Sequence, residues 1–105
     1  MSTKVKAFVY VEAQVSVPFE EYPWDKDNPG IKKQPGFISK TWLSGVDNNS
    51  IGGFYAFDSI ENAKKYATGF MFEKGKKLNI GLTTRIFSAD RVEEASSEMN
   101  TPFYQ

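Results

Sequence analysis

Four stretches of the sequence have the two-residue period of a β-strand, and their order along the chain constrains the fold more than any other feature. In residues 4–14, every second residue from position 5 onward is a valine or an alanine. A similar alternation recurs in three further stretches, residues 37–44, 54–57 and 80–88. Because successive side chains of a strand point to opposite faces of a sheet, this period is typical of strands.

Helical patterns separate the first strand from the second and the third from the fourth. Asp58 and Glu61 have the spacing of a capping box, and apolar residues then recur at intervals of three and four as far as Met71. Residues 16–34 contain Pro23 and the pair Pro29-Gly30. Both interrupt helices, so we expect one or two short helical turns and an irregular loop there. Whether residues 25–33 form a lid is left open.

The resulting order is β-α-β-β-α-β, which predicts a ferredoxin-like α+β fold with a four-stranded antiparallel sheet. A chain of 105 residues suffices for one domain, which we expect to span residues 1–105. Residues 89–105 form a polar tail that ends near Phe103 and Tyr104. We expect this tail to dock, with the partner subunit of an oligomer as one place for it.

Both helices of such a fold cover one face of the sheet and leave the other face open. The alternation predicts that the open face carries some of Phe8, Tyr10, Trp42 and Tyr55. Apolar surface left in water costs about 25 cal/mol per Å². We therefore expect a second copy of the chain to cover this face by packing sheet against sheet.

The sequence contains no cysteine and no histidine. The first absence excludes disulfides, thiolate nucleophiles and Cys-ligated metals. The second removes the commonest general base and the commonest metal ligand. We therefore expect no metal site. Residues 25–30 begin like a calcium loop, but Pro29 stands at a ligand position. The lysines between residues 64 and 77 are interpreted as a solvated helix face.

The charge balance and the hydropathy of the chain restrict the classes of partner that we expect. The chain has 13 basic and 13 acidic residues, and this balance argues against binding to nucleic acid. Residues 53–57 resemble part of an RNA-binding sheet motif, but the flanking basic residue is missing and Asp58 follows, which leaves that reading a minor alternative. The first 20 residues contain no long apolar run. We expect a cytoplasmic protein that does not bind membranes.

Aromatic residues make up 15% of the chain, and a group of them carries a family resemblance. The motif residues are Pro35-Gly36-Phe37, Lys40, Trp42, Gly52-Gly53-Phe54-Tyr55-Ala56-Phe57-Asp58, Ala63 and Tyr66. In these residues the chain resembles the YdhR-type mono-oxygenases of the dimeric α+β barrel superfamily. The interrupted pattern before Pro35 departs from the regular helix usual in that family.

The resemblance implies a homodimer whose two sheets form a barrel, with a pocket between sheet and helices in each subunit. Related barrels oxidise aromatic or quinol-like compounds with O₂ and without a cofactor, so we expect no cofactor here. The expected pocket residues are Trp24, Phe37, Trp42, Tyr55, Phe57, Tyr66 and Phe70. The candidates for a catalytic group are Tyr55 and Tyr66 as hydrogen-bond donors and Arg85 as a partner of a substrate oxyanion. No residue stands out as a catalytic base.

Three functions stay open at this point. The first is a cofactor-independent mono-oxygenase that acts on a small aromatic or quinone-like ligand. The second is a protein that binds such a ligand without chemistry. The third is an interaction module in which the aromatic sheet serves only dimerisation, because one fold hosts many functions.

Overall fold

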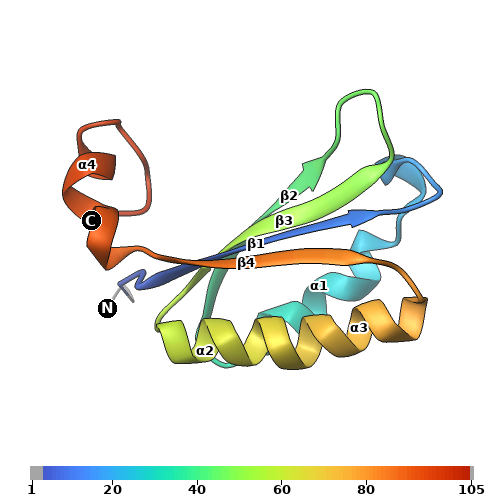
Figure 1. The fold of residues 1–105 in the computed structure, drawn as a ribbon, viewed down its shortest axis with the longest axis horizontal. Coiled ribbons are helices and arrows are strands. Elements are labelled where there is room, and N and C mark those ends of the chain that lie inside the picture. The colour runs from blue at the N-terminus through green and yellow to red at the C-terminus, as the bar shows by residue number, and fades with distance from the viewer. Residues whose placement is uncertain (1–3, 105) are drawn as a thin grey trace.

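A computed structural model describes residues 4–104 and contains one four-stranded sheet (Figure 1). The strands are β1 (Ala7–Gln14), β2 (Phe37–Ser44), β3 (Ser50–Phe57) and β4 (Leu82–Ser88). Their order in the sheet is β2-β3-β1-β4, and all three neighbouring pairs are antiparallel. This topology confirms the predicted ferredoxin-like α+β fold. The first and last strands begin later than the sequence pattern predicted, at Ala7 and Leu82.

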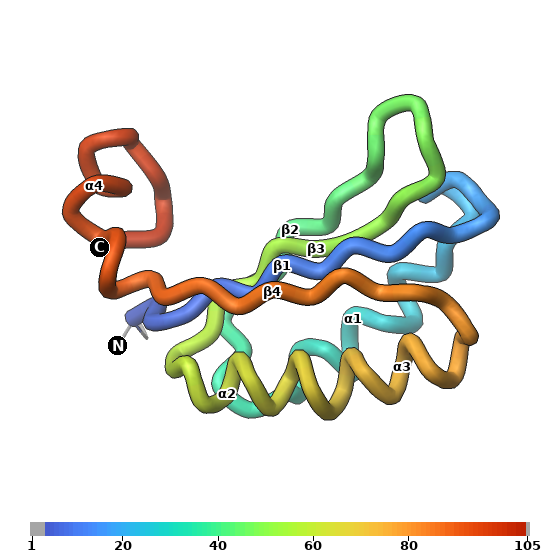
Figure 2. Tube along the Cα trace, viewed as in Figure 1, coloured from blue at the N-terminus to red at the C-terminus, as the bar shows by residue number. Residues whose placement is uncertain are grey.

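Three helices cover one face of this sheet, as the backbone trace shows (Figure 2). They are α1 (Trp24–Lys32), α2 (Ile60–Lys65) and α3 (Met71–Leu78), and a single 3₁₀ turn, Phe19–Glu21, precedes α1. A second 3₁₀ turn (Asp90–Val92) and α4 (Glu93–Ser97) follow β4 and curl away from the helical layer beyond the end of the sheet. None of the helices in residues 4–104 is long and apolar enough to cross a membrane.

The main core lies between the sheet and the helices. On β1 the valine and alanine parity faces the helices, so Ala7, Val9 and Val11 are buried there. Tyr55 pairs with Val9 across β1 and β3, and it therefore lies on the same face. Ala63 of α2 packs against these residues from the helical layer.

Of the four aromatic residues from which the open face was expected to draw some, Trp42 and Tyr55 lie on the helix side instead. Both pack against the helix-side core, whereas Phe8 and Tyr10 lie on the opposite face as predicted. On β2 the reason is a β-bulge between Phe37 and Ser39, which shifts the register against β3. Such an extra residue changes which parity of the strand faces the core.

The structure also corrects the prediction that Pro29-Gly30 ends the helix before β2, since α1 runs through both residues. An internal proline loses one backbone hydrogen bond and crowds the preceding turn. Tertiary contacts offset this cost. Ile31 is buried in the core, and the side chain of Asn28 accepts a hydrogen bond of 3.0 Å from the indole of Trp42.

The helix between β3 and β4 is longer and less regular than an ideal α-helix. Its N-cap is Ser59, the residue after Asp58, and the Ser59 hydroxyl accepts a hydrogen bond from the backbone N–H of Asn62. Between α2 and α3 the chain forms a π-helical segment, Tyr66–Phe70. Because of this wider turn, Tyr66 and Met71 are both buried although five residues separate them.

The two glycines at positions 52 and 53 lie inside β3, not before it, so the strand is longer than predicted. A side chain at Gly52 would collide with the backbone carbonyl of Val11 on the neighbouring strand. The backbone of Gly52 therefore approaches that of β1 closely, and the β-bulge of the sheet lies on β2.

The open face of the sheet carries a second, smaller cluster. Phe8 stacks on Phe54 with ring centroids 5.0 Å apart, and Phe103 and Tyr104 from the tail pack against it. The Tyr104 hydroxyl donates a hydrogen bond of 2.8 Å to the carbonyl of Ala89, so the end of the tail contacts its first residue. Docking of the tail on a partner subunit stays a prediction.

Candidate functional site

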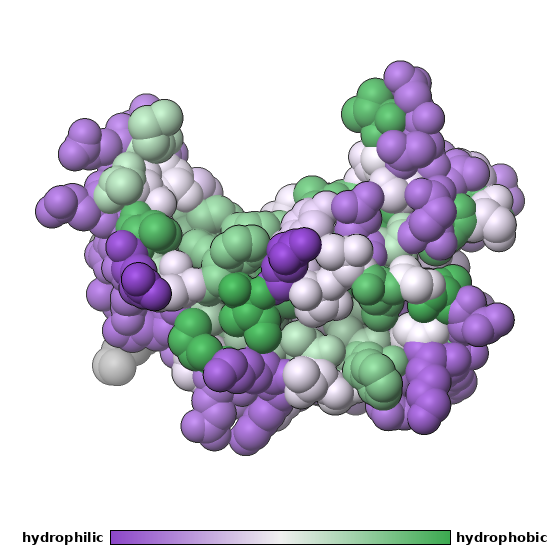
Figure 3. Space-filling view, viewed as in Figure 1, coloured by the Kyte–Doolittle hydropathy of each residue, from purple (hydrophilic) through white to green (hydrophobic). Residues whose placement is uncertain are grey.

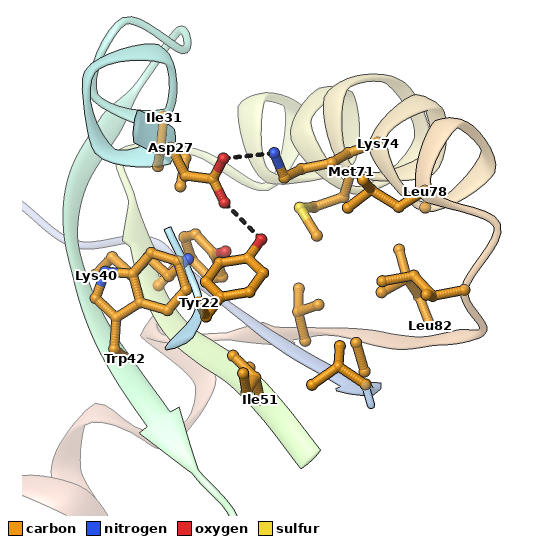
Figure 4. Close-up of a pocket in the computed structure, with 17 residues that line it drawn as sticks. Tyr22, Asp27, Ile31, Lys40, Trp42, Ile51, Met71, Lys74, Leu78 and Leu82 are labelled. Atoms are coloured by element: carbon orange, nitrogen blue, oxygen red, sulfur yellow. Dashed lines mark hydrogen bonds and ion pairs between the residues drawn. The ribbon is translucent and has the colours of Figure 1, made fainter. Parts of the chain in front are cut away.

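A pocket opens between the helix side of the sheet and helices α1 and α3 (Figure 4). Its volume is about 40 Å³. Most of its wall is apolar, from residues of β1, β3, α1, α3 and β4: Val11, Ala13, Ile31, Ile51, Met71, Leu78, Ile80 and Leu82. Two aromatic residues, Trp42 and Tyr55, line it together with four polar or charged side chains whose positions define its chemistry, Tyr22, Asp27, Lys40 and Lys74.

The Asp27 carboxylate links three elements across the pocket (Figure 4). Lys74 of α3 donates a hydrogen bond of 2.6 Å to Asp27 Oδ1, and Tyr22 donates one of 2.6 Å to Asp27 Oδ2. Burial, followed by this hydrogen bond to a carboxylate, raises the pKa of Tyr22. Both carboxylate oxygens of Asp27 therefore have donors within the protein, and Tyr22 stays protonated.

Lys40 is the other cation of the pocket, and its surroundings are aromatic. Its Nζ lies 3.2 Å from the centroid of the Trp42 ring and 4.8 Å from that of Tyr55. Within residues 4–104, no carboxylate forms an ion pair with it. Burial lowers the pKa of Lys40 to about 7, the charge of Asp27 opposes this shift and that of Lys74 adds to it. The cation–π attraction of the two rings favours the charged form and so acts against desolvation.

Helix α1 and the segment before it fix the indole of Trp42. Its Nε1 donates to Asn28 Oδ1, and the rings of Phe19 and Tyr22 each pack 5.8 Å from it between centroids. Trp42 therefore presents a fixed face to the ammonium group of Lys40. An aromatic ring held this way positions the amine without neutralising it.

A stack of rings continues from Tyr55 into the core. The centroid of Tyr66 lies 4.8 Å from that of Tyr55, 5.3 Å from that of Phe57 and 5.4 Å from that of Phe70. Burial raises the pKa of Tyr55 to about 12 and raises that of Tyr66 as well. The Tyr66 hydroxyl is buried, and it has no hydrogen-bond partner in the part of the chain that the structure describes. Neither tyrosine is therefore suited to act as a base at neutral pH.

Only some of the residues that were expected in a pocket line it in the structure. Trp42 and Tyr55 line the pocket, whereas Phe37, Phe57, Tyr66 and Phe70 form the ring cluster behind Tyr55. Trp24, at the start of α1, is 45% exposed and does not line the pocket. Arg85 is exposed and pairs with Tyr10, which places it on the open face of the sheet.

Four polar lining residues were absent from the sequence-based candidates. Lys40 and Trp42 share a parity on β2, and this signal was available because Trp42 was already a candidate. Lys74 lies three residues after buried Met71 on α3, so its side chain returns to the same helix face. Tyr22 and Asp27 could not be found, because the segment that holds them was expected to be an irregular loop.

The pocket is small for a ligand site. A volume of about 40 Å³ holds roughly two or three water molecules, whereas small-molecule sites usually have ~300–1,000 Å³. An aromatic ligand therefore requires movement of the wall. Leu78 of α3 is 47% exposed and marks the solvent side of the pocket, and the Asp27–Lys74 ion pair joins the two helices that have to separate.

A family model described as "Putative mono-oxygenase ydhR" matches residues 25–101, which is about three-quarters of the chain and runs from the second residue of α1 through β2, β3 and β4 to the end of α4. No curated protein matches the chain.

Proposed function

The chain belongs to the putative mono-oxygenase ydhR family, and on that premise we propose that it oxidises an aromatic or quinol-like small molecule with O₂ and without a cofactor. The observation that carries the proposal is the pocket itself. It combines an apolar wall and two aromatic faces with a lysine that has no carboxylate partner in residues 4–104. Such a site binds a flat apolar ring and favours negative charge on one of its substituents.

The reaction is balanced without an added reductant. For a simple hydroxy-aromatic compound, 1-naphthol and O₂ give 1,4-naphthoquinone and water. One oxygen atom enters the ring at the carbon para to the hydroxyl. The other oxygen leaves as water with the hydroxyl hydrogen and the hydrogen displaced from that carbon. The substrate supplies all the electrons, and the protein supplies orientation, exclusion of water and stabilisation of the substrate anion.

The proposed ligand enters by separating α1 from α3. Asp27 and Lys74 form the ion pair between these helices, and their side chains are only 12% and 27% exposed. On the solvent side the pocket wall includes the side chain of Leu78, which is half-exposed and can change rotamer easily. Closure after entry then removes water from the site.

We also propose that two copies pack sheet against sheet. The space-filling view shows a hollow between the tail and the β2–β3 hairpin, with hydrophobic side chains in it (Figure 3). Within the described chain, Phe87 of β4 lies directly opposite Phe8 and is 48% exposed. A second copy would remove this apolar surface from water.

Oxygen uptake with 1-naphthol tests the proposed activity. We expect uptake above the protein-free rate, with one O₂ consumed for each quinone formed, and none with 1-methoxynaphthalene, whose oxygen carries no proton. Trp42→Ala should lower the rate at least tenfold, whereas the matched variant Trp24→Ala, outside the pocket, should not. A rate equal to the protein-free rate would contradict the activity. Stabilisation by 1-naphthol without any uptake would favour the alternative of ligand binding without chemistry.

A further inference from the structure

Among the residues that the structure describes, Lys40 has no ion-pair partner, although an acidic residue lies in the same pocket. Asp27 is the acidic group that lines the pocket, and Tyr22 and Lys74 already occupy its two oxygens. The Nζ of Lys40 is instead enclosed by the rings of Trp42 and Tyr55. Its three potential donors therefore have no carboxylate acceptor within residues 4–104.

Charge counting shows what the pocket lacks. With both lysines protonated, the pocket holds two positive charges and the single negative charge of Asp27. A half-buried site does not stabilise the unbalanced charge, so Lys40 either releases its proton or gains an anion. An ionisable ligand fits both alternatives. It can give its proton to the neutral amine of Lys40, and the anion that remains can then pair with the ammonium group.

The groups that face Lys40 from the surrounding elements keep the amine close to this balance. They are Asp27 on α1, Tyr22 just before α1, Lys74 on α3 and Tyr55 on β3. The two tyrosines stay protonated at neutral pH, and the charges of Asp27 and Lys74 act in opposite directions. The pKa of Lys40, about 7, means that both its forms are populated near neutral pH. Catalytic lysines commonly have pKa values in this range.

We propose that Lys40 is the catalytic base of this pocket, and that the substrates are hydroxy-aromatic compounds whose ionised oxygen then pairs with the Lys40 ammonium. This inference rests on the proposed function, and it names the substrate class and the group that ionises it. Tyr55 and Tyr66 are not needed as bases. Arg85, on the opposite face of the sheet, has no part in the step.

The step is a proton transfer and involves no oxidation. The O–H bond of the substrate breaks, and its electron pair remains on oxygen. An N–H bond forms on Lys40 Nζ, so a neutral pair becomes an ion pair. The phenolate is the electron-rich species that O₂ then attacks, and it lies against the cation in a site with little water, where the attraction is strong.

The test measures ionisation of a bound probe without turnover. The probe is 1-naphthol under nitrogen, and 1-methoxynaphthalene is the control ligand that cannot ionise. Naphtholate absorbs at longer wavelength than naphthol, and phenolic hydroxyls have pKa values of about 10, so the free probe is mostly un-ionised at pH 8. A pH indicator dye in weak buffer reports the protons released on binding.

Wild-type protein should bind 1-naphthol as naphtholate at pH 8 with almost no proton released, because Lys40 takes it up. At pH 6 Lys40 is already protonated, so close to one proton should be released for each naphtholate bound. Lys40→Met should lower the ionised fraction at least tenfold and still bind 1-methoxynaphthalene. Lys40→Arg should bind naphtholate but release a proton at both pH values, since arginine stays charged. The surface variant Lys65→Met should match the wild type.

Each other outcome is decisive. Bound probe that stays un-ionised in wild type, or that ionises equally in Lys40→Met, overturns the role of Lys40 and leaves the pocket function standing. Proton release at pH 8 equal to that of Lys40→Arg overturns the base and leaves only a counter-ion. Failure of both naphthalenes to bind overturns the proposed pocket function, and with it the role of Lys40.

Discussion

Replacing Lys40 by methionine should flatten the dependence of folding stability on pH between pH 7 and pH 9. In the folded protein the pKa of Lys40 is about 7, against 10.5 for an unperturbed lysine. Between these values the unfolded chain holds a proton on Lys40 that the folded chain does not hold. The free energy of unfolding therefore rises with pH in this window, and the stability is lost as the pH falls toward 7.

The magnitude follows from the two pKa values. The full slope is about 1.4 kcal/mol for each pH unit. At pH 7 the folded lysine is half protonated, so the rise from pH 7 to pH 9 amounts to about 2 kcal/mol. Lys40→Met cannot contribute this slope, because methionine does not titrate. The other groups are shared, so the difference between wild type and variant isolates Lys40.

The assay is urea unfolding followed by tryptophan fluorescence at pH 7, 8 and 9, at one ionic strength and one protein concentration. From pH 7 to pH 9, the free energy of unfolding of the wild type should rise by about 2 kcal/mol relative to that of Lys40→Met. Lys65→Met is the matched control, because the side chain of Lys65 is 61% exposed and its variant should run parallel to the wild type. A change below about 0.5 kcal/mol for Lys40→Met would refute the reasoning, since Lys40 would then keep its proton in the folded protein.

Four further changes test other parts of the structure. Tyr66→Phe removes a buried hydroxyl without a partner, so thermal unfolding should show unchanged or higher stability, and a loss above about 1 kcal/mol would contradict this. Asp27→Asn leaves its lysine partner without a counter-ion and should cost about 1–3 kcal/mol by urea unfolding, and no cost would mean that the ion pair is not formed. Gly36→Ala should cost at least about 1 kcal/mol because the φ of Gly36 is 75°, and a variant as stable as wild type would show that the turn has another conformation. Phe87→Glu should halve the mass measured by light scattering, whereas an unchanged dimer mass would exclude the sheet-to-sheet arrangement.

The sequence was sufficient for the fold because its local signals agree with one another. The order of the strand and helix patterns predicted the topology, although the pattern of β1 by itself did not decide which of its faces lies under the helices. The signals failed where a tertiary contact overrides a local preference. The hydrogen bond from Trp42 to Asn28 and the burial of Ile31 hold α1 together through Pro29.

The candidate site was predictable in its aromatic part only. Trp42 and Tyr55 were candidates because large rings are rare and conspicuous, whereas lysines are frequent and usually exposed. Lys40 differs from the surface lysines by its neighbours in space, which the β2 bulge and the approach of α1 bring together. No periodicity in the chain records that Asp27 and Lys74, 47 residues apart, form an ion pair.

The π-helical segment sets the rotational phase of everything that follows it. Five residues separate Tyr66 from Met71, and in an uninterrupted α-helix that spacing would turn Met71 by about 140° away from the sheet. The wider turn absorbs one residue, so Lys74 and Leu78 return to the pocket side. Deleting one residue from this segment would therefore leave a regular α-helix in which Met71 follows Tyr66 by four positions, so that the side chains of α3 keep their side toward the pocket. The wider turn thus lets the chain carry one additional residue at this point without changing which side chains of α3 reach the pocket.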